Sequence, residues 1–294
     1  MGNNKQLVSS LALLTTAIIW GFAFVAQSVG LETLGTFTFQ AGRCAVAVPF
    51  LSLMIIVFKK LGIIKKKVFS RENIIGGIVC GAVLFAASNV QQYGISMTAV
   101  ANASFLSTLY IFIVPMIGIV VGNKPNPIIW FCVAISMTGL YLLTSAGDMT
   151  INRGDIIVIV SSFLFAMHII VIDKFAPKGD GTVISCFQFA VTGILSFICA
   201  ILFHNNTMAQ VIDNWIPICY AGICSCGIAY TLQIVFQHNL KPSHASLILC
   251  LESVFGALGA WIILGEKLSL IQIIGCVLMF SAVVLANVTQ NRKY

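Results

Sequence analysis

The chain has 294 residues, of which 59% are hydrophobic and only 9% are charged. Its charge-poor stretches are repeatedly long enough to cross a bilayer, which excludes a soluble globular protein. The net charge of +7 does not indicate nucleic-acid binding, because the basic residues lie between apolar stretches and not on a folded soluble face. We therefore expect an all-α membrane protein, since a chain in lipid must satisfy its backbone polar groups internally.

Ten apolar stretches of about 20 residues, each bounded by charge, Pro or Gly, predict ten transmembrane helices. In chain order they cover residues 7–29, 36–58, 73–93, 98–121, 127–145, 154–172, 183–203, 214–236, 242–264 and 268–289. The first stretch is longer than a typical signal-peptide core and no small-residue cleavage site follows it. We expect it to be a helix of the bundle.

The distribution of basic residues predicts the orientation. With the N-terminus inside, the sixteen Lys and Arg residues all fall on the cytoplasmic side, except Arg43 within a span and Arg153 and Lys267 outside. An excess of Lys and Arg in cytoplasmic loops is the rule for helical membrane proteins. The sequence predicts a multi-pass protein of the cytoplasmic membrane with both termini in the cytoplasm.

The ten cysteines all fall inside predicted spans, where a free thiol packs as a small apolar side chain. No Cys-x-x-Cys pair and no Cys/His cluster has the spacing of a metal site. We expect no disulfide framework, no bound metal and no cofactor.

Shifting the chain by 142 residues lays the third and fourth predicted helices on the eighth and ninth. Gln91 then meets Gln233, and Tyr110 meets Glu252. Five helices in each half is an odd number, so the two halves must insert with opposite orientations. The sequence predicts a five-plus-five inverted repeat, with halves at 1–146 and 147–294, and a substrate site near the midplane between them.

Four segments resemble the EamA branch of the drug/metabolite transporter superfamily: LESVFGALGAWIILGEKL at 251–268, IWGFAF at 19–24, QYGI at 92–95 and ANASFL at 101–106. The resemblance covers essentially the whole chain. It implies a ten-helix permease that moves small metabolites, with a leaning toward export of amino acids. Ser253 stands where that family often has Pro, so we expect the helix to be less kinked near Glu252.

Glu252 is the most informative single residue of the candidate site. It lies about ten residues into its helix, so it is ~15 Å deep in a hydrocarbon core of ~30 Å. A charge at that depth costs at least ~2.5 to 3.5 kcal/mol, so the group must face a partner, water or the bundle interior, or be protonated. Three roles stay open: binding a cationic group of the substrate, exchanging a proton, or a structural hydrogen bond between helices.

Arg43 and His168 each have a functional and a structural interpretation. Arg43 is ~10 Å deep, where it can contact a substrate carboxylate or extend outward toward Glu32. His168 can relay protons or be a hydrogen-bonded interior group.

Five uncharged residues complete the predicted substrate site. Tyr110 is included because the repeat places it opposite Glu252, and Gln233 because it pairs with Gln91. Trp20 can lie over a cationic group, an interaction worth ~0.5 to 2 kcal/mol. Asn89 and Gln92 share one side of the third helix, where amides need partners within the bundle.

These residues favour a secondary transporter of a small organic metabolite over an enzyme. One midplane acid with a shallower Arg suits an amino acid or another amine-bearing compound, and no nucleotide-binding Gly-x-x-x-x-Gly-Lys-Ser/Thr motif is present. The alternatives are a polytopic membrane enzyme, which needs clustered interfacial acids or histidines, and a channel, which needs a polar stripe or a charged ring. Substrate identity, transport direction, proton coupling and the choice between monomer and homodimer stay open, and membrane lipids are the expected surroundings.

Overall fold

The structure, a computed structural model, describes residues 2–65, 67–98, 100–120, 122, 125–144, 152–203, 206–265 and 268–291. All regular structure in these ranges is helical. The helices are α1 (Gly2–Leu31), α2 (Thr36–Lys60), α3 (Arg71–Ile95), α4 (Val100–Ser107), α5 (Tyr110–Val120), α6 (Pro127–Thr144), α7 (Arg153–Phe175), η1 (Ala176–Lys178), α8 (Gly181–Phe203), α9 (Met208–Asp213), α10 (Trp215–Cys219), η2 (Tyr220–Ala229), α11 (Tyr230–Gln237), α12 (Pro242–Leu249), α13 (Glu252–Gly259), η3 (Ala260–Leu264) and α14 (Leu270–Asn291).

Nine helical segments in the described ranges are long and apolar enough to cross a membrane. Four of the nine are composite: α4 and α5 run together in Ala103–Val120, and α7 and η1 in Arg153–Lys178. In the same way α10, η2 and α11 form Trp215–Gln237, and α12, α13 and most of η3 form Pro242–Ile263. The shorter apolar helix at Pro127–Leu143 coincides with the fifth predicted span. The all-α membrane class is confirmed, and the count of ten spans stays a prediction.

Local capping interactions explain where several helices begin. The Ser70 side chain accepts a hydrogen bond from the backbone of Asn73 at the start of α3, and Asn152 and Asp155 cap the start of α7 reciprocally. Such caps satisfy backbone N–H groups that have no partner within the helix. Gly265, with φ of +72°, ends η3 in the left-handed conformation that glycine adopts without strain.

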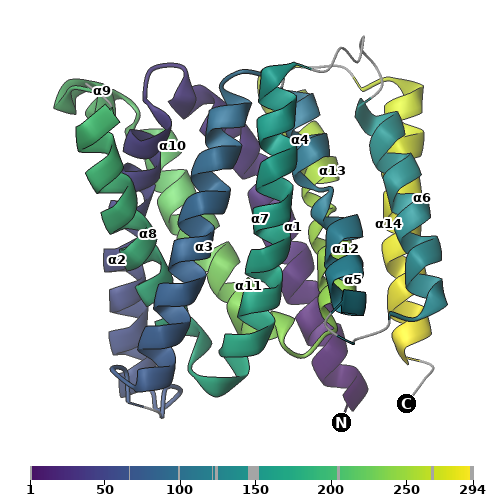
Figure 1. Cartoon of the computed structure of the whole chain (residues 1–294), viewed down its shortest axis with the longest axis horizontal. Helices are drawn as coiled ribbons and strands as arrows, with labels where there is room; N and C mark the ends of the chain where they lie inside the picture. The colour runs from purple at the N-terminus through teal and green to yellow at the C-terminus, as the bar shows by residue number, and fades with distance from the viewer. Residues whose placement is uncertain are drawn as a thin grey trace.

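The helices form one bundle in which neighbours along the chain are often not neighbours in space (Figure 1). α2 packs against α8, α3 against α7, α6 against α14, and α1 against α13. α1 begins and α14 ends on the same side of the bundle, which we call the termini side, whereas α9 lies on the opposite side (Figure 1). The largest buried apolar cluster is formed mainly by α1, α5, α6, α12 and α14.

The spacing Gly77-x-x-x-Gly81 serves packing within the bundle. A Cβ at Gly77 would lie 2.2 Å from Cβ of Phe187, and one at Gly81 would lie 2.7 Å from the carbonyl oxygen of Gln188. Both neighbours belong to α8. Small residues at these positions therefore allow α3 and α8 to approach closely.

Replacing Gly21 with Ala is expected to destabilise the bundle where α1 crosses α13. The added Cβ would lie 2.5 Å from Cβ of Phe255 and 2.7 Å from the backbone nitrogen of Gly256. Overpacking of this kind costs about 1–3 kcal/mol, because backbone must move. The melting temperature of the purified protein measures it. Gly256→Ala is the matched control, since a Cβ there has its nearest neighbour at 3.6 Å. Equal melting temperatures for the two variants would contradict the prediction.

Candidate functional site

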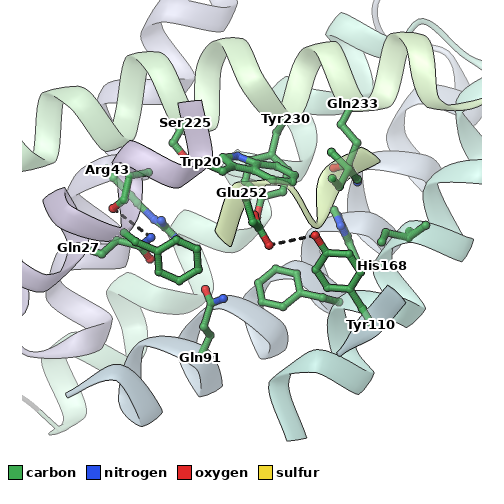
Figure 2. A pocket seen from close by; sticks show the side chains of 15 residues that line it. Trp20, Gln27, Arg43, Gln91, Tyr110, His168, Ser225, Tyr230, Gln233 and Glu252 are labelled. Atoms are coloured by element: carbon green, nitrogen blue, oxygen red, sulfur yellow. Dashed lines mark hydrogen bonds between the residues drawn. The ribbon is translucent and has the colours of Figure 1, made fainter. Parts of the chain in front are cut away.

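A small cavity lies at the middle of the bundle, and six of the eight predicted site residues line it (Figure 2). Its volume is about 40 Å³. A cavity holds one water for each ~10–15 Å³ of such volume, so this space accommodates a few waters and must widen to admit a metabolite. The lining residues are Trp20, Ala23, Phe24, Gln27, Arg43, Gln91, Tyr110, Phe165, His168, Ile169, Ser225, Tyr230, Gln233, Leu249 and Glu252.

Two interrupted helices position Tyr110 and Glu252 in the cavity. The helix formed by α4 and α5 is interrupted at Thr108–Leu109, and the helix formed by α12 and α13 is interrupted at Cys250–Leu251. Each second half-helix begins with a cavity residue, Tyr110 in α5 and Glu252 in α13. The two interruptions are thus separated by the same 142 residues as Tyr110 and Glu252.

Both breaks are tight turns stabilised by side-chain donors. Backbone N–H groups donate to carbonyls three residues back, as from Ile111 to Thr108 at 3.0 Å and from Ser253 to Cys250 at 3.2 Å. The Thr108 hydroxyl donates to the carbonyl oxygen of Phe105 at 2.9 Å, and the Cys250 thiol donates to that of Leu247 at 3.1 Å. These carbonyls lose their ordinary helical partner where the turn tightens.

The expectation of a less kinked helix near Glu252 is wrong. The helix is interrupted directly before Glu252, although Ser253 replaces the family's proline. The Ser253 hydroxyl donates to the carbonyl oxygen of Ser104 at 3.3 Å and so joins this break to α4. Serine, threonine and cysteine side chains here replace the function that proline has in kinked helices.

Tyr110 and Glu252 meet inside the cavity. The Tyr110 hydroxyl donates to Oε1 of Glu252 at 2.9 Å, and the two side chains point toward each other (Figure 2). Their exposed fractions are 4% and 6%. Glu252 therefore faces the bundle interior, and its hydrogen bond joins the two halves of the chain.

Arg43 turns into the bundle and does not extend toward Glu32. Its exposed fraction is 4%, and its Nη2 donates to Oε1 of Gln40 one turn earlier on α2. Turning the Gln92 amide by half a rotation lets its oxygen accept from Arg43 Nη2 at 3.1 Å. Nε of Arg43 has no hydrogen-bond partner although it is buried. An unpaired buried donor of a charged group marks a place where a ligand or water completes the site.

Trp20 forms an aromatic wall of the cavity with Tyr230, their ring centroids 4.5 Å apart. Nε1 of Trp20 is buried without a hydrogen-bond partner, and so is Oε1 of Gln233. Nε2 of Gln233 donates one hydrogen bond to Gln237 at 2.9 Å, and its oxygen is available to a ligand. The cavity thus presents unpaired donors from Trp20 and Arg43 and an unpaired acceptor from Gln233.

His168 lines the cavity, and a hydrogen bond to α8 fixes its ring. Its Nε2 forms a hydrogen bond of 2.9 Å with Oε1 of Gln188 on α8, and its ring packs edge-on against Tyr230 at 5.9 Å between centroids. One ring nitrogen is therefore committed to the protein. The tautomer with Nε2 protonated leaves Nδ1 as an acceptor toward the cavity.

Asn89 and Gln92, the other two predicted site residues, lie outside the cavity lining. Asn89 donates to the Ser196 hydroxyl at 3.2 Å and to the carbonyl oxygen of Phe85, and it joins α3 to α8. Gln92 contacts Gln40 at 3.0 Å and lies beside Arg43, outside the cavity lining. Gln91 lines the cavity instead, because a step of one residue turns a helix by about 100°.

Four further lining residues are not among the predicted site residues: Gln27, Gln91, Tyr230 and Phe165. For Gln91 a signal was available, since the repeat already matched it with Gln233. Tyr230 follows the π-helical segment η2, which alters the rotation of every later residue on that helix. No pattern in the sequence marks such a segment.

The described fold is that of a multi-pass α-helical membrane protein with a polar cavity between its halves. The EamA-like transporter family model matches the chain twice, over residues 7–145 and 152–288. The chain belongs to this family and is a membrane transporter. The family and the names of its relatives indicate a transporter and not an enzyme.

Relatives and a solved structure agree with this assignment. An uncharacterized transporter of Archaeoglobus fulgidus is 26% identical over 96% of this chain and 87% of its own length. The uncharacterized transporter YoaV of Bacillus subtilis is 19% identical over 96% of this chain and 98% of its own length. A crystal structure of a protein at 16% identity superposes with a TM-score of 0.79, covering 97% of this chain and 98% of that one, which shows the same fold.

Proposed function

We propose that this transporter is a secondary carrier that exports a small zwitterionic metabolite, such as an amino acid or a related amine-bearing compound, by alternating access. The observation that carries the proposal is the presence of one carboxylate, on Glu252, and one guanidinium, on Arg43, in the wall of a single cavity. A zwitterion offers a partner to each. A multiply anionic solute would be repelled by the carboxylate of Glu252.

The unpaired hydrogen-bonding groups of the cavity support binding of the substrate carboxylate at Arg43 and of its ammonium group at Glu252. The free Nε of Arg43 and Nε1 of Trp20 are donors suited to a carboxylate. Glu252 and the free oxygen of Gln233 are acceptors suited to an ammonium group. Charge-assisted hydrogen bonds of this kind are about twice as strong as neutral ones. The aromatic wall of Trp20 and Tyr230 adds a surface over which a cation is also attracted.

An inverted repeat between halves at 1–146 and 147–294 is part of the proposal, and the cavity lining supports it. Gln91 and Gln233, like Tyr110 and Glu252, differ by 142 in number and line the same cavity. A contact between two equivalent positions, such as the Tyr110–Glu252 hydrogen bond, lies on the axis that relates two halves. The cavity would then lie on the pseudo-axis, where alternating-access carriers bind their substrate.

The ionisable cavity residues differ from the residues at the equivalent positions of the other half, and this difference makes the site asymmetric. A shift of 145 residues matches Trp20 with Phe165, Ala23 with His168, and Arg43 with Gln188. The equivalents of the three ionisable residues Arg43, His168 and Glu252 are thus Gln188, Ala23 and Tyr110, none of them charged at neutral pH. The two halves would supply a common frame, and these three differences would supply specificity.

The proposed sidedness rests on exposed basic residues. Lys5, Lys59, Lys65 and Arg71 are exposed and belong to the termini side. We assign this side to the cytoplasm because cytoplasmic loops are enriched in Lys and Arg. Proton coupling through Glu252 belongs to the same proposal, since an acid that binds an ammonium group can release it on taking up a proton.

Counterflow in reconstituted vesicles tests the function. Vesicles loaded with one unlabelled amino acid are expected to accumulate the same labelled amino acid transiently against its gradient. Addition of nucleotide is expected to have no effect on that uptake. A channel gives equilibration without an overshoot, and saturable uptake only of organic anions that carry no amine would contradict the proposed substrate class.

A further inference from the structure

A second concave site lies on the membrane-facing surface, between α2 and α8. This groove has a volume of about 900 Å³, and small residues such as Gly42, Ala45, Ala190 and Gly193 form its floor and walls. Phe197 and Ile201 border it with exposed fractions of 59% and 65%. An apolar groove beside exposed apolar side chains of spanning helices opens into lipid.

The groove occupies only one half of the membrane thickness. Its residues run from Thr38 to Pro49 on α2 and from Ile201 to Phe189 on α8, which is the half opposite the termini side. At the groove floor the two helices are in contact, since a Cβ at Gly193 would lie 2.8 Å from Cβ of Cys44. Toward the termini side the seam between them is filled. The Ser52 hydroxyl lies 3.7 Å from the Cys186 thiol, and Ile55 and Val183 share a buried cluster.

This half-depth shape distinguishes between occupants. Eleven steps along α2, from Thr38 to Pro49, rise ~17 Å, close to half of the ~30 Å hydrocarbon core. A transmembrane helix of a partner needs a face that continues through the whole core, and the packed half of the α2–α8 seam offers it no groove. One acyl chain of one leaflet has the length of half the core, and an acyl chain has no polar group to satisfy.

The residues at the mouth of the groove suit the membrane–water interface. Asn206 fixes the segment after α8 by accepting from the backbone of Gly35 at 2.9 Å and donating to the carbonyl oxygen of Thr33 at 3.2 Å. Met208, 73% exposed, follows at the mouth, and Trp215, 61% exposed, is the first residue of α10. Tryptophan at this position is typical of the headgroup level of a membrane.

We propose that the α2–α8 groove is a binding site for one acyl chain of a diacyl membrane lipid from the leaflet opposite the termini side. The groove is separate from the central cavity but shares a wall with it. Cys44, on the groove floor, directly follows Arg43 in α2. Phe189 packs edge-on against Tyr230 with 5.3 Å between ring centroids. Lipid in the groove would contact side chains that position two cavity residues.

Native mass spectrometry of the full-length protein tests the lipid site, with diacyl phosphatidylglycerol as the probe. The wild-type protein is expected to retain a single lipid at activation energies that remove all others. Ala190→Phe and Ala200→Phe each fill the groove and are expected to lose that lipid. The matched control is Ala134→Phe on an exposed position of α6, which is expected to retain it.

Three outcomes would overturn the proposal. Retention of the lipid by both groove-filled variants, with melting temperatures equal to wild type, would exclude the groove as its site. A change from dimer to monomer in those variants, at constant lipid count, would identify a second copy of the chain as the occupant. Should both variants fail to fold, a spin-labelled phosphatidylglycerol on the wild-type protein decides: absence of a slowly exchanging component excludes the site. Failure of the counterflow experiment leaves this measurement unaffected.

Discussion

The Glu252→Gln variant is expected to lose binding of amine-bearing solutes while it keeps its fold. Glutamine has the same shape, and its side-chain oxygen can still accept the hydrogen bond from Tyr110, which spans 2.9 Å in the wild type. A hydrogen bond to a charged group contributes about 1.5–3 kcal/mol, and each 1.4 kcal/mol is about tenfold in affinity. We expect the dissociation constant of an amine to rise about tenfold to a hundredfold.

Thermal stability of the purified protein with and without ligand measures this change. A ligand at a hundred times its dissociation constant stabilises the native state by ~2.7 kcal/mol, and this increase should largely disappear in the variant. The control is Tyr110→Phe, which keeps the carboxylate and removes only the hydroxyl that competes for it. If Glu252→Gln binds a primary amine as well as wild type does, Glu252 has a structural role and the cavity lacks its cationic subsite.

The Arg43→Gln variant is expected to lose recognition of the carboxylate and to retain recognition of the amine. Glutamine is the residue that the proposed repeat has at the equivalent position, Gln188, so the substitution would make the two proposed halves more alike. It also removes the buried Nε and the donor to Gln40. We expect about a tenfold to hundredfold weaker binding of a zwitterion, since a charge-assisted contact is lost.

Two ligands and two variants together separate the subsites. A monoamine without a carboxylate should bind wild type and Arg43→Gln alike, and it should bind Glu252→Gln poorly. An amino acid should be weakened in both variants. Gln92→Leu is the matched control for packing around Arg43, because it removes a neighbour of the guanidinium from outside the cavity lining. Equal losses of both ligands in Arg43→Gln would show that Arg43 holds the cavity together and does not bind carboxylates.

The sequence predicted the membrane class and the limits of the spans closely. The seventh span, for example, was expected at 183–203 and the helix covers Gly181–Phe203. It also predicted Glu252 at mid-depth and its pairing with Tyr110. Hydropathy is a local property of 20 or so residues, and an ionisable group in lipid is costly wherever the chain folds, so both are written in short stretches of sequence.

The rotation of each helix was beyond the sequence. Gln92 was expected in the cavity, and the structure has Gln91 there and Gln92 against Gln40. The break before Glu252 was not expected either, since it depends on hydroxyl and thiol donors such as Thr108 and Cys250 finding carbonyl partners. Which side of a helix faces a neighbour is set by packing between residues far apart in the chain.

Hydropathy and charge alone identify a helical membrane protein with a single acid, Glu252, at the middle of a span, because each of those properties follows from the cost of placing polar groups in lipid. The meeting of Arg43, Trp20, His168 and Gln233 with that acid around one cavity depends on how distant helices pack, which the tertiary structure shows. The same packing makes the membrane-facing surface between α2 and α8 concave only in the half opposite the termini side. Such packing requires crossings such as Gly21 on Phe255, where the shapes of two distant segments must fit.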